Sequence, residues 1–163
     1  MGFSLGGALA LKVAEAYKDS VRKNILIAPA LYTEQACPLP FGPLFKKSIS
    51  VQFSFLDSTS FSVLKNFKGE VLLIIREYDG LSAKYFGRLA GTSVEKIKLR
   101  NKASSLSDYY SAIHSEVIPE IEKHVDRNNF HKIILSECDH SIMSWLRDKT
   151  DVAKILSNKI AFF

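Results

Sequence analysis

Cysteine is scarce in this 163-residue sequence, which contains only Cys37 and Cys138. Two cysteines cannot build the disulfide framework of a small secreted protein, and these two lack the close spacing of a metal-binding motif. We therefore expect reduced thiols, as in a cytoplasmic protein. Although Cys138 lies two positions before His140, we expect it to be a small core residue and not a nucleophile.

Long hydrophobic runs are also missing. No apolar stretch approaches the roughly 20 residues that a membrane-spanning helix requires. We find no internal repeat, linker or low-complexity segment. With 47% hydrophobic and 24% charged residues, the chain has the balance of one globular domain and not that of a disordered tail.

Clustered basic charge is missing too, although the formal net charge is +5, from 22 Lys and Arg against 17 Asp and Glu. The basic residues are mostly scattered. The densest group, from Lys96 to Lys102, alternates basic with apolar residues and so predicts the solvent-facing side of a short strand. We expect no nucleic-acid partner, and salt-dependent binding of nucleic acid would contradict this expectation.

Apolar patterning predicts alternating strands and helices. Short apolar runs predict strands at residues 24–29, 69–75 and 130–135, the first two buried on both faces. Helical spacing predicts helices over residues 5–17, 82–90, about 104–126 (kinked or divided at Pro119) and from about Asp151. Buried strands that alternate with helices indicate an α/β fold with a mostly parallel sheet flanked by helices.

Two of the predicted helices have a defined apolar side. In residues 5–17 that side consists of Leu5, Leu9, Val13, Ala16 and Tyr17. In the last helix it consists of Val152, Ile155, Leu156 and Ile160. We expect both sets to face the core.

Residues 33–66 have no clear periodicity. They contain three closely spaced prolines and several phenylalanines, which do not belong in a plain solvated loop. We expect a lid or small cap packed over something apolar. This composition favours a small-molecule substrate with an apolar acyl group.

The most informative motif is Gly2-Phe3-Ser4-Leu5-Gly6, a G-x-S-x-G sequence directly before the first predicted helix. In this motif the serine occupies a sharp strand-to-helix turn, and the flanking glycines Gly2 and Gly6 leave room for strand and helix to approach closely. The helix N-terminus favours developing negative charge. The alternative is that Ser4 is simply a helix N-cap.

A serine nucleophile needs a base, and the sequence offers one oriented by an acid. Asp79 lies four residues beyond Ile75 and His140 five residues beyond Leu135, each just after a predicted strand. Catalytic residues of α/β sheets lie at such strand ends. Asp79 could instead be a turn residue before Gly80. Weaker candidates for these roles are Asp57, Asp108, Asp139, His114, His124 and His131.

These motifs together resemble the α/β-hydrolase fold superfamily over most of the chain. Residues 2–7 resemble its nucleophile elbow, residues 26–30 its next strand, residues 67–79 the strand that delivers the acid, and residues 138–141 the histidine loop. The resemblance implies a serine hydrolase of ester, thioester or amide bonds, without metal or cofactor, in which Ser4, Asp79 and His140 form the triad. The N–H of Leu5 would be one oxyanion-hole donor.

Two features depart from the family. His140 follows Asp79 by 61 positions, which exceeds the usual connection, so we expect residues 104–126 to be a helical insertion. Only Met1 precedes Gly2, whereas most of the sheet normally precedes the elbow. We therefore expect the C-terminal part of a longer hydrolase, whose activity needs the missing strands and oxyanion loop.

An alternative interpretation is a truncated, non-catalytic α/β-hydrolase remnant. Such a chain would act as an interaction module through its unpaired sheet edge. Its partner would be a separately encoded N-terminal half or another copy of the chain.

Overall fold

The computed structural model describes residues 1–17, 19–49, 51, 53–76, 117–136, 138 and 142–163. The predicted helix at 82–90, the basic strand at 96–102 and most of the predicted insertion at 104–126 lie outside these residues. Asp79 and His140 lie outside them as well.

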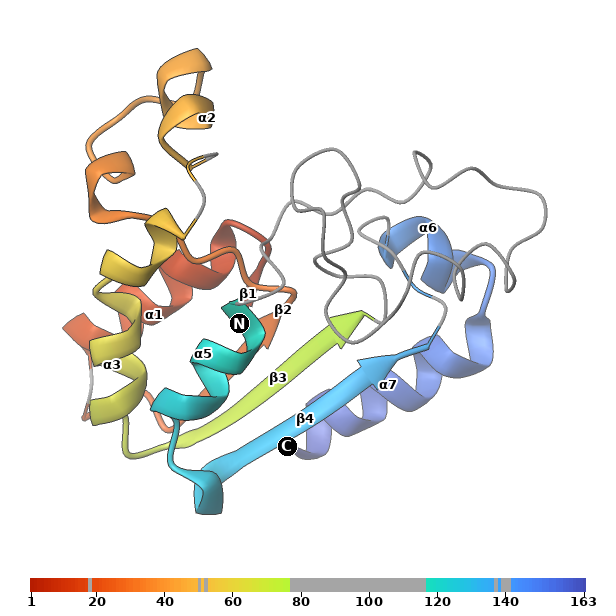
Figure 1. Ribbon diagram of the computed structural model, residues 1–163. Coiled ribbons are helices and arrows are strands. Elements are labelled where there is room, and N and C mark those ends of the chain that lie inside the picture. The colour runs from red at the N-terminus through yellow and green to blue at the C-terminus, as the bar shows by residue number, and fades with distance from the viewer. Residues whose placement is uncertain (18, 50, 52, 77–116, 137, 139–141) are drawn as a thin grey trace.

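The described residues form a four-stranded sheet of β1 (Gly2–Phe3), β2 (Lys23–Ile27), β3 (Glu70–Arg76) and β4 (Phe130–Leu135), in that spatial order (Figure 1). All three neighbouring pairs are parallel. The predicted α/β class is thus confirmed, and the carboxyl ends of all four strands lie at one edge of the sheet.

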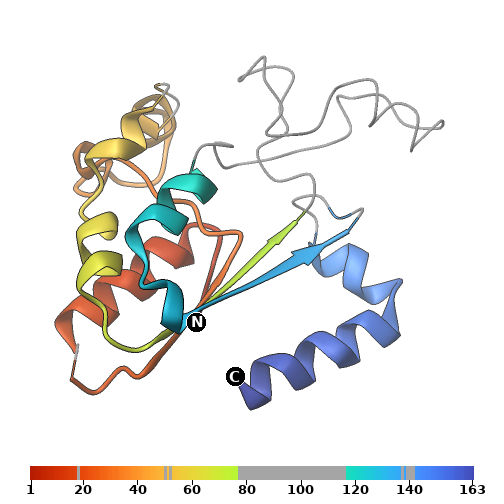
Figure 2. The same ribbon diagram turned by 60° about the horizontal axis from the view of Figure 1, so that its bottom comes forward.

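Helices cover both faces of the sheet (Figure 2). One face carries α1 (Gly6–Ala16), α3 (Ser60–Asn66) and α5 (Val117–His124), and the other carries α6 (Ile142–Arg147) and α7 (Thr150–Phe162). Side chains of β3 alternate between the two cores: Leu73 belongs to the first, and Leu72 and Ile74 to the second. This division explains why the apolar run of β3 is continuous.

Strand β2 is less enclosed than the sequence predicts. Leu26 is fully buried on the α1 side, but Ile25 and Ile27 on the opposite face are only half-buried. They lie at the margin of the core formed by α6 and α7. The prediction of burial on both faces is therefore wrong for β2 and confirmed for β3.

The first helix is confirmed, but its predicted buried side is wrong. The residues that face the core are Gly7, Ala8, Leu11 and Ala14. Leu9, Val13 and Tyr17 are instead 61%, 52% and 64% exposed. The small residues let α1 approach the sheet closely, so they and not the larger apolar residues determine the contact face. In α7, Leu156 is buried as expected, whereas Ile155 is exposed.

The segment 33–66 is more ordered than its sequence suggests. It contains the 3₁₀ turn η1 (Glu34–Ala36), helix α2 (Pro43–Ile49), the 3₁₀ turn η2 (Ser54–Asp57) and α3. We call residues 34–57 the cap lobe. Its two ends are tied together by Asp57, which accepts hydrogen bonds from Thr33 Oγ1 at 2.8 Å and from the backbone N–H of Glu34 at 3.3 Å.

Near α5 the structure adds details that the sequence did not predict. Pro119 lies in the first turn of α5, where its missing N–H needs no partner, so it does not kink the described helix. The 3₁₀ turn η4 (Arg127–Asn129) leads into β4, and Asp126 caps it through Asn128 N–H. The short helix α6 had no counterpart among the predicted elements.

Candidate active site

Ser4 lies in a sharp turn between β1 and α1, at the carboxyl edge of the sheet. Its φ of 51° is a left-handed backbone conformation that costs a non-glycine residue about 1–3 kcal/mol. Three backbone hydrogen bonds hold it there: Ser4 N–H donates to Ile27 O at 3.0 Å, and Ser4 O accepts from Gly7 and Ala30, both at 2.9 Å. The N-cap position of α1 is Leu5, so Ser4 is not the N-cap.

The surrounding glycines have unequal roles. A Cβ at Gly2 would lie 2.0 Å from the carbonyl oxygen of Gly6, and a Cβ at Gly7 would lie 2.5 Å from Pro29 Cβ. A Cβ at Gly6 would meet nothing within 4 Å. The close approach of strand and helix therefore requires glycine at positions 2 and 7, and not at position 6.

A second strained residue lies on the neighbouring strand end. Ala28, directly after β2, has a φ of 41°, and its N–H donates to Ile74 O at 2.7 Å. Ser4 contacts the same connection through Ala30. Backbone strain of this kind concentrates at functional sites, where the surrounding structure maintains it.

Arg76 is a candidate that the sequence analysis missed. It is the last residue of β3, one position beyond the predicted strand at 69–75, and only 1% of it is exposed. Its guanidinium carbon lies 5.7 Å from the ring centroid of Phe3, a cation–π contact. Arg76 thus buries a positive charge against the residue that precedes Ser4. The only sequence signal was a charged residue closing an apolar run.

The predicted acid and base, Asp79 and His140, follow β3 and β4 in the chain but lie outside the described residues. Among the rival candidates, Asp57 is engaged at the base of the cap lobe. His124 has Nδ1 at 2.7 Å from Glu120 O, and His131 packs edge-on against Phe163. Asp108, His114 and Asp139 also lie outside the described residues.

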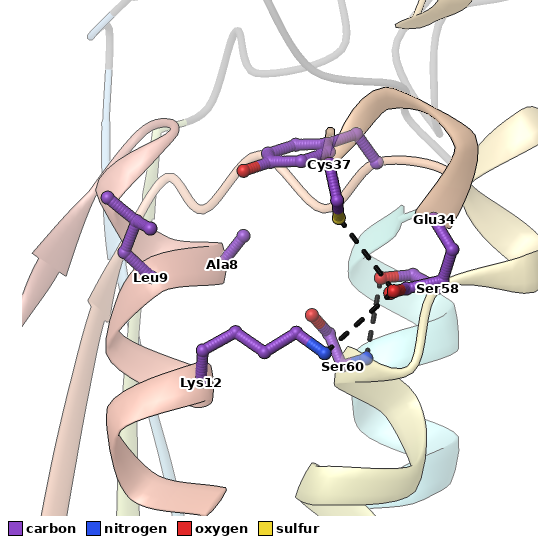
Figure 3. Close-up of a pocket in the computed structure, with 8 residues that line it drawn as sticks. Ala8, Leu9, Lys12, Glu34, Cys37, Ser58 and Ser60 are labelled. Carbon is purple, nitrogen blue, oxygen red and sulfur yellow. Dashed lines mark hydrogen bonds and ion pairs between the residues drawn. The ribbon is translucent and has the colours of Figure 1, made fainter. Parts of the chain in front are cut away.

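A pocket of about 180 Å³ lies between α1 and the base of the cap lobe (Figure 3). Its lining residues are Ala8, Leu9, Lys12, Tyr32, Glu34, Cys37, Ser58 and Ser60. Sequence reasoning did not find this pocket, because its walls come together only in the tertiary structure.

Glu34 is the centre of the polar network at this pocket. Its Oε1 accepts hydrogen bonds from Thr59 N–H at 2.9 Å and from Thr59 Oγ1 at 2.8 Å. Its Oε2 lies 3.9 Å from Lys12 Nζ and 3.8 Å from Cys37 Sγ. Lys12 also hydrogen-bonds to Thr59 Oγ1. These contacts attach the cap lobe to both α1 and α3.

Electrostatics at this pocket follow from burial and from this network. Burial acts to raise the pKa of Glu34, but the hydrogen bonds from Thr59 and the charge of Lys12 outweigh it and lower that pKa. Burial and the charge of Glu34 raise the pKa of Cys37, so its thiol stays protonated at neutral pH and is a poor nucleophile. Burial also raises the pKa of Tyr32.

The lowered pKa of Glu34 predicts pH-dependent stability. A carboxylate with a depressed folded pKa stabilises the protein above its unfolded pKa, and this contribution is lost as the pH falls through the folded value. Relative to Glu34→Gln, the native protein should be more stable at pH 7, by about 1 kcal/mol, and this difference should shrink as the pH falls to 3. Urea unfolding at both pH values would measure this, with Asp19→Asn, at an exposed carboxylate, as control. An equal difference at the two pH values would contradict it.

No protein-family model matches this sequence, and no curated protein does. Among solved structures, the fold is similar to that of a probable hydrolytic enzyme from Pseudomonas aeruginosa PAO1, with a TM-score of 0.51 and 12% sequence identity. The similarity covers 94% of this chain and 61% of that chain. No helix among the described residues is long and apolar enough to cross a membrane. At 12% identity the likeness establishes a distantly related α/β fold.

Proposed function

We propose that this chain carries the nucleophile of a serine hydrolase, of the α/β-hydrolase type, that acts on ester, thioester or amide bonds. One observation carries the proposal: Ser4 has a strained φ of 51° in a tight turn between a parallel strand and a helix. A serine held in this way presents its hydroxyl at the edge of the sheet, beside a helix N-terminus.

The proposed reaction follows from the roles of the three predicted residues. Ser4 Oγ attacks the carbonyl carbon while His140 accepts its proton, and Asp79 orients the imidazole. The oxyanion forms near the N–H of Leu5, which has helical dihedral angles just before α1. His140 then returns the proton to the leaving group. Water, activated by the same histidine, releases the acid and regenerates the serine.

A second oxyanion-hole donor would strengthen this site. The chain spans 61% of the length of the hydrolytic enzyme that it resembles in fold. In the α/β-hydrolase family a loop before the elbow supplies a second oxyanion donor. Loss of one such donor lowers the rate by about 10²–10³, so the second donor contributes strongly to catalysis in that family.

The histidine and the acid can be tested directly. His140→Gln and Asp79→Asn should each lower kcat for 4-nitrophenyl butyrate by at least about 10²-fold, because the proton acceptor or its orientation is lost. His124→Gln, on α5, is the matched control and should leave kcat unchanged. Full activity in either triad variant would contradict the assigned roles.

The structure also offers an observation in favour of a second candidate function, an interaction module. Strand β2 pairs with β3 along all five residues, but with β1 only at Leu26 and Ile27. An edge of this kind can pair with another chain. Val13 and Tyr17 on the adjoining helix α1 are exposed apolar residues. For this candidate we propose a second copy of the chain as partner, because a free strand edge can pair with its own copy about a two-fold axis.

Light scattering between about 1 and 100 μM would test this second candidate. We expect a concentration-dependent dimer that Val13→Lys shifts towards monomer, because a charge would replace an apolar contact. Ser62→Lys, on the exposed side of α3, is the control and should leave the equilibrium unchanged. A monomer throughout the concentration range would contradict the candidate.

A further inference from the structure

Both walls of the pocket between α1 and the cap lobe are connected to the Ser4 turn by short stretches of chain. On one side, Ala8 lies four residues after Ser4, about 6 Å along the helix axis. On the other side, Ala30 donates its N–H to Ser4 O at 2.9 Å, and Tyr32, two residues later, lines the pocket. These short connections to Ser4 make the pocket a candidate site for the group attached to a carbonyl that Ser4 attacks.

The wall opposite α1 carries hydroxyl groups. Figure 3 shows Ser58 and Ser60 across the pocket from Ala8 and Leu9. Ser60 is only 2% exposed, and within the described part of the chain its hydroxyl has no hydrogen-bond partner; its backbone N–H bonds to Ser58 Oγ at 3.4 Å. The Tyr32 hydroxyl likewise has no partner among the described residues. Both side chains line the pocket, so these two hydroxyls are available to hydrogen-bond a polar group or water held there.

Charge and volume narrow the class of ligand. The Lys12 ammonium lies 3.6 Å from Glu15 and 3.9 Å from Glu34, so two carboxylates offset it and no surplus cation remains for an anionic ligand. A volume of about 180 Å³ is similar to that of a cavity of about 150 Å³ that holds one benzene molecule. This space accommodates a short chain of a few carbon atoms, and a fatty acyl group would extend out of it.

We propose that this pocket binds the acyl group of the substrate and selects a short, neutral acyl group that carries a hydroxyl. The inference rests on the proposed role of Ser4 as nucleophile. It replaces the expectation of an apolar acyl group, which came from the phenylalanines of residues 33–66. Phe45, Phe55 and Phe61 are buried in the packing of that segment itself, and the exposed Phe41 and Phe53 do not line this pocket.

Four 4-nitrophenyl esters test the inference on the 163-residue protein. The esters of 3-hydroxybutanoate and 3-methylbutanoate have nearly the same shape, and the first carries a hydroxyl where the second carries a methyl group. The octanoate ester tests a longer acyl chain, and the hemisuccinate ester tests a negative charge. We expect kcat/KM for 3-hydroxybutanoate to exceed that for 3-methylbutanoate by about tenfold, because one buried hydrogen bond is gained. Octanoate and hemisuccinate should be poorer still.

Matched variants test which side chains cause the preference for the hydroxyl-bearing ester. Ser60→Ala and Tyr32→Phe should each reduce the tenfold preference to about threefold or less, whereas Ser62→Ala, exposed on the same helix, should retain it. Melting curves of all three variants verify the fold. Two results would overturn the pocket assignment alone: ester turnover without the preference, and a preference that is unchanged in Ser60→Ala and Tyr32→Phe. A fluorophosphonate adduct at Ser4 without turnover of any ester would also overturn only the pocket assignment. If the protein gives neither an adduct at Ser4 nor turnover of any ester, both the proposed function and this inference are overturned.

Discussion

Replacing Ser4 by alanine is expected to reduce ester hydrolysis by about 10³–10⁶-fold, because the nucleophile is removed and only binding and oxyanion contacts remain. The three backbone hydrogen bonds of Ser4 do not involve its side chain, and alanine must adopt the same φ of 51°. The backbone conformation of the turn should therefore be retained, and the free energy of unfolding serves as the check. Initial rates with 4-nitrophenyl butyrate, beside urea unfolding, measure both quantities.

A second variant of Ser4 separates the loss of the nucleophile from the cost of the strained backbone. Ser4→Gly removes the nucleophile too, but glycine adopts a positive φ without steric cost. We expect it to be equally inactive and about 1 kcal/mol more stable than Ser4→Ala. Ser62→Ala is the control for loss of a serine elsewhere. Residual activity within tenfold of the native protein in either Ser4 variant would contradict the assigned nucleophile.

The second large effect concerns the glycines of the turn. Gly7→Ala should destabilise the protein by about 3 kcal/mol, because the new Cβ would lie 2.5 Å from Pro29 Cβ and 2.9 Å from Pro29 Cα. Relief requires α1 to move away from β2, and that movement would displace Ser4. The catalytic rate of Gly7→Ala should therefore fall together with its stability.

Gly6→Ala is the matched control, one position away in the same helix. Its Cβ meets nothing within 4 Å, and alanine favours the helix, so we expect a neutral to stabilising change of up to about 1 kcal/mol. Denaturant midpoints of the two variants would measure the contrast. Equal changes of stability in Gly7→Ala and Gly6→Ala would contradict the close approach of α1 to Pro29.

The sequence predicted the sheet well because its signals are local. The runs at 69–75 and 130–135 agree with β3 (Glu70–Arg76) and β4 (Phe130–Leu135) to within one residue. The strand-to-helix turn at Ser4 was predicted from a pattern of five residues. In both cases the residues that determine the structure are adjacent in the chain.

Features that depend on tertiary contacts were not predictable in this way. The buried side of α1 was wrong because Gly7, Ala8 and Ala14 determine how closely the helix packs, a property that hydrophobic spacing does not measure. The base of the cap lobe is closed by bonds such as that of Thr33 to Asp57, which are 24 positions apart. The pocket beside Ser4 combines α1, the cap lobe and α3, and no local pattern indicates it.

The most direct test is to locate the covalent adduct that a fluorophosphonate probe forms with the native protein. Trypsin cleavage after Lys12 releases residues 1–12, in which Ser4 is the only residue with a hydroxyl side chain. We predict that mass spectrometry will find the adduct on this peptide in the folded protein, and neither in urea-unfolded protein nor in His140→Gln. An unmodified 1–12 peptide, with no adduct or with adducts only elsewhere, would contradict Ser4 as the nucleophile.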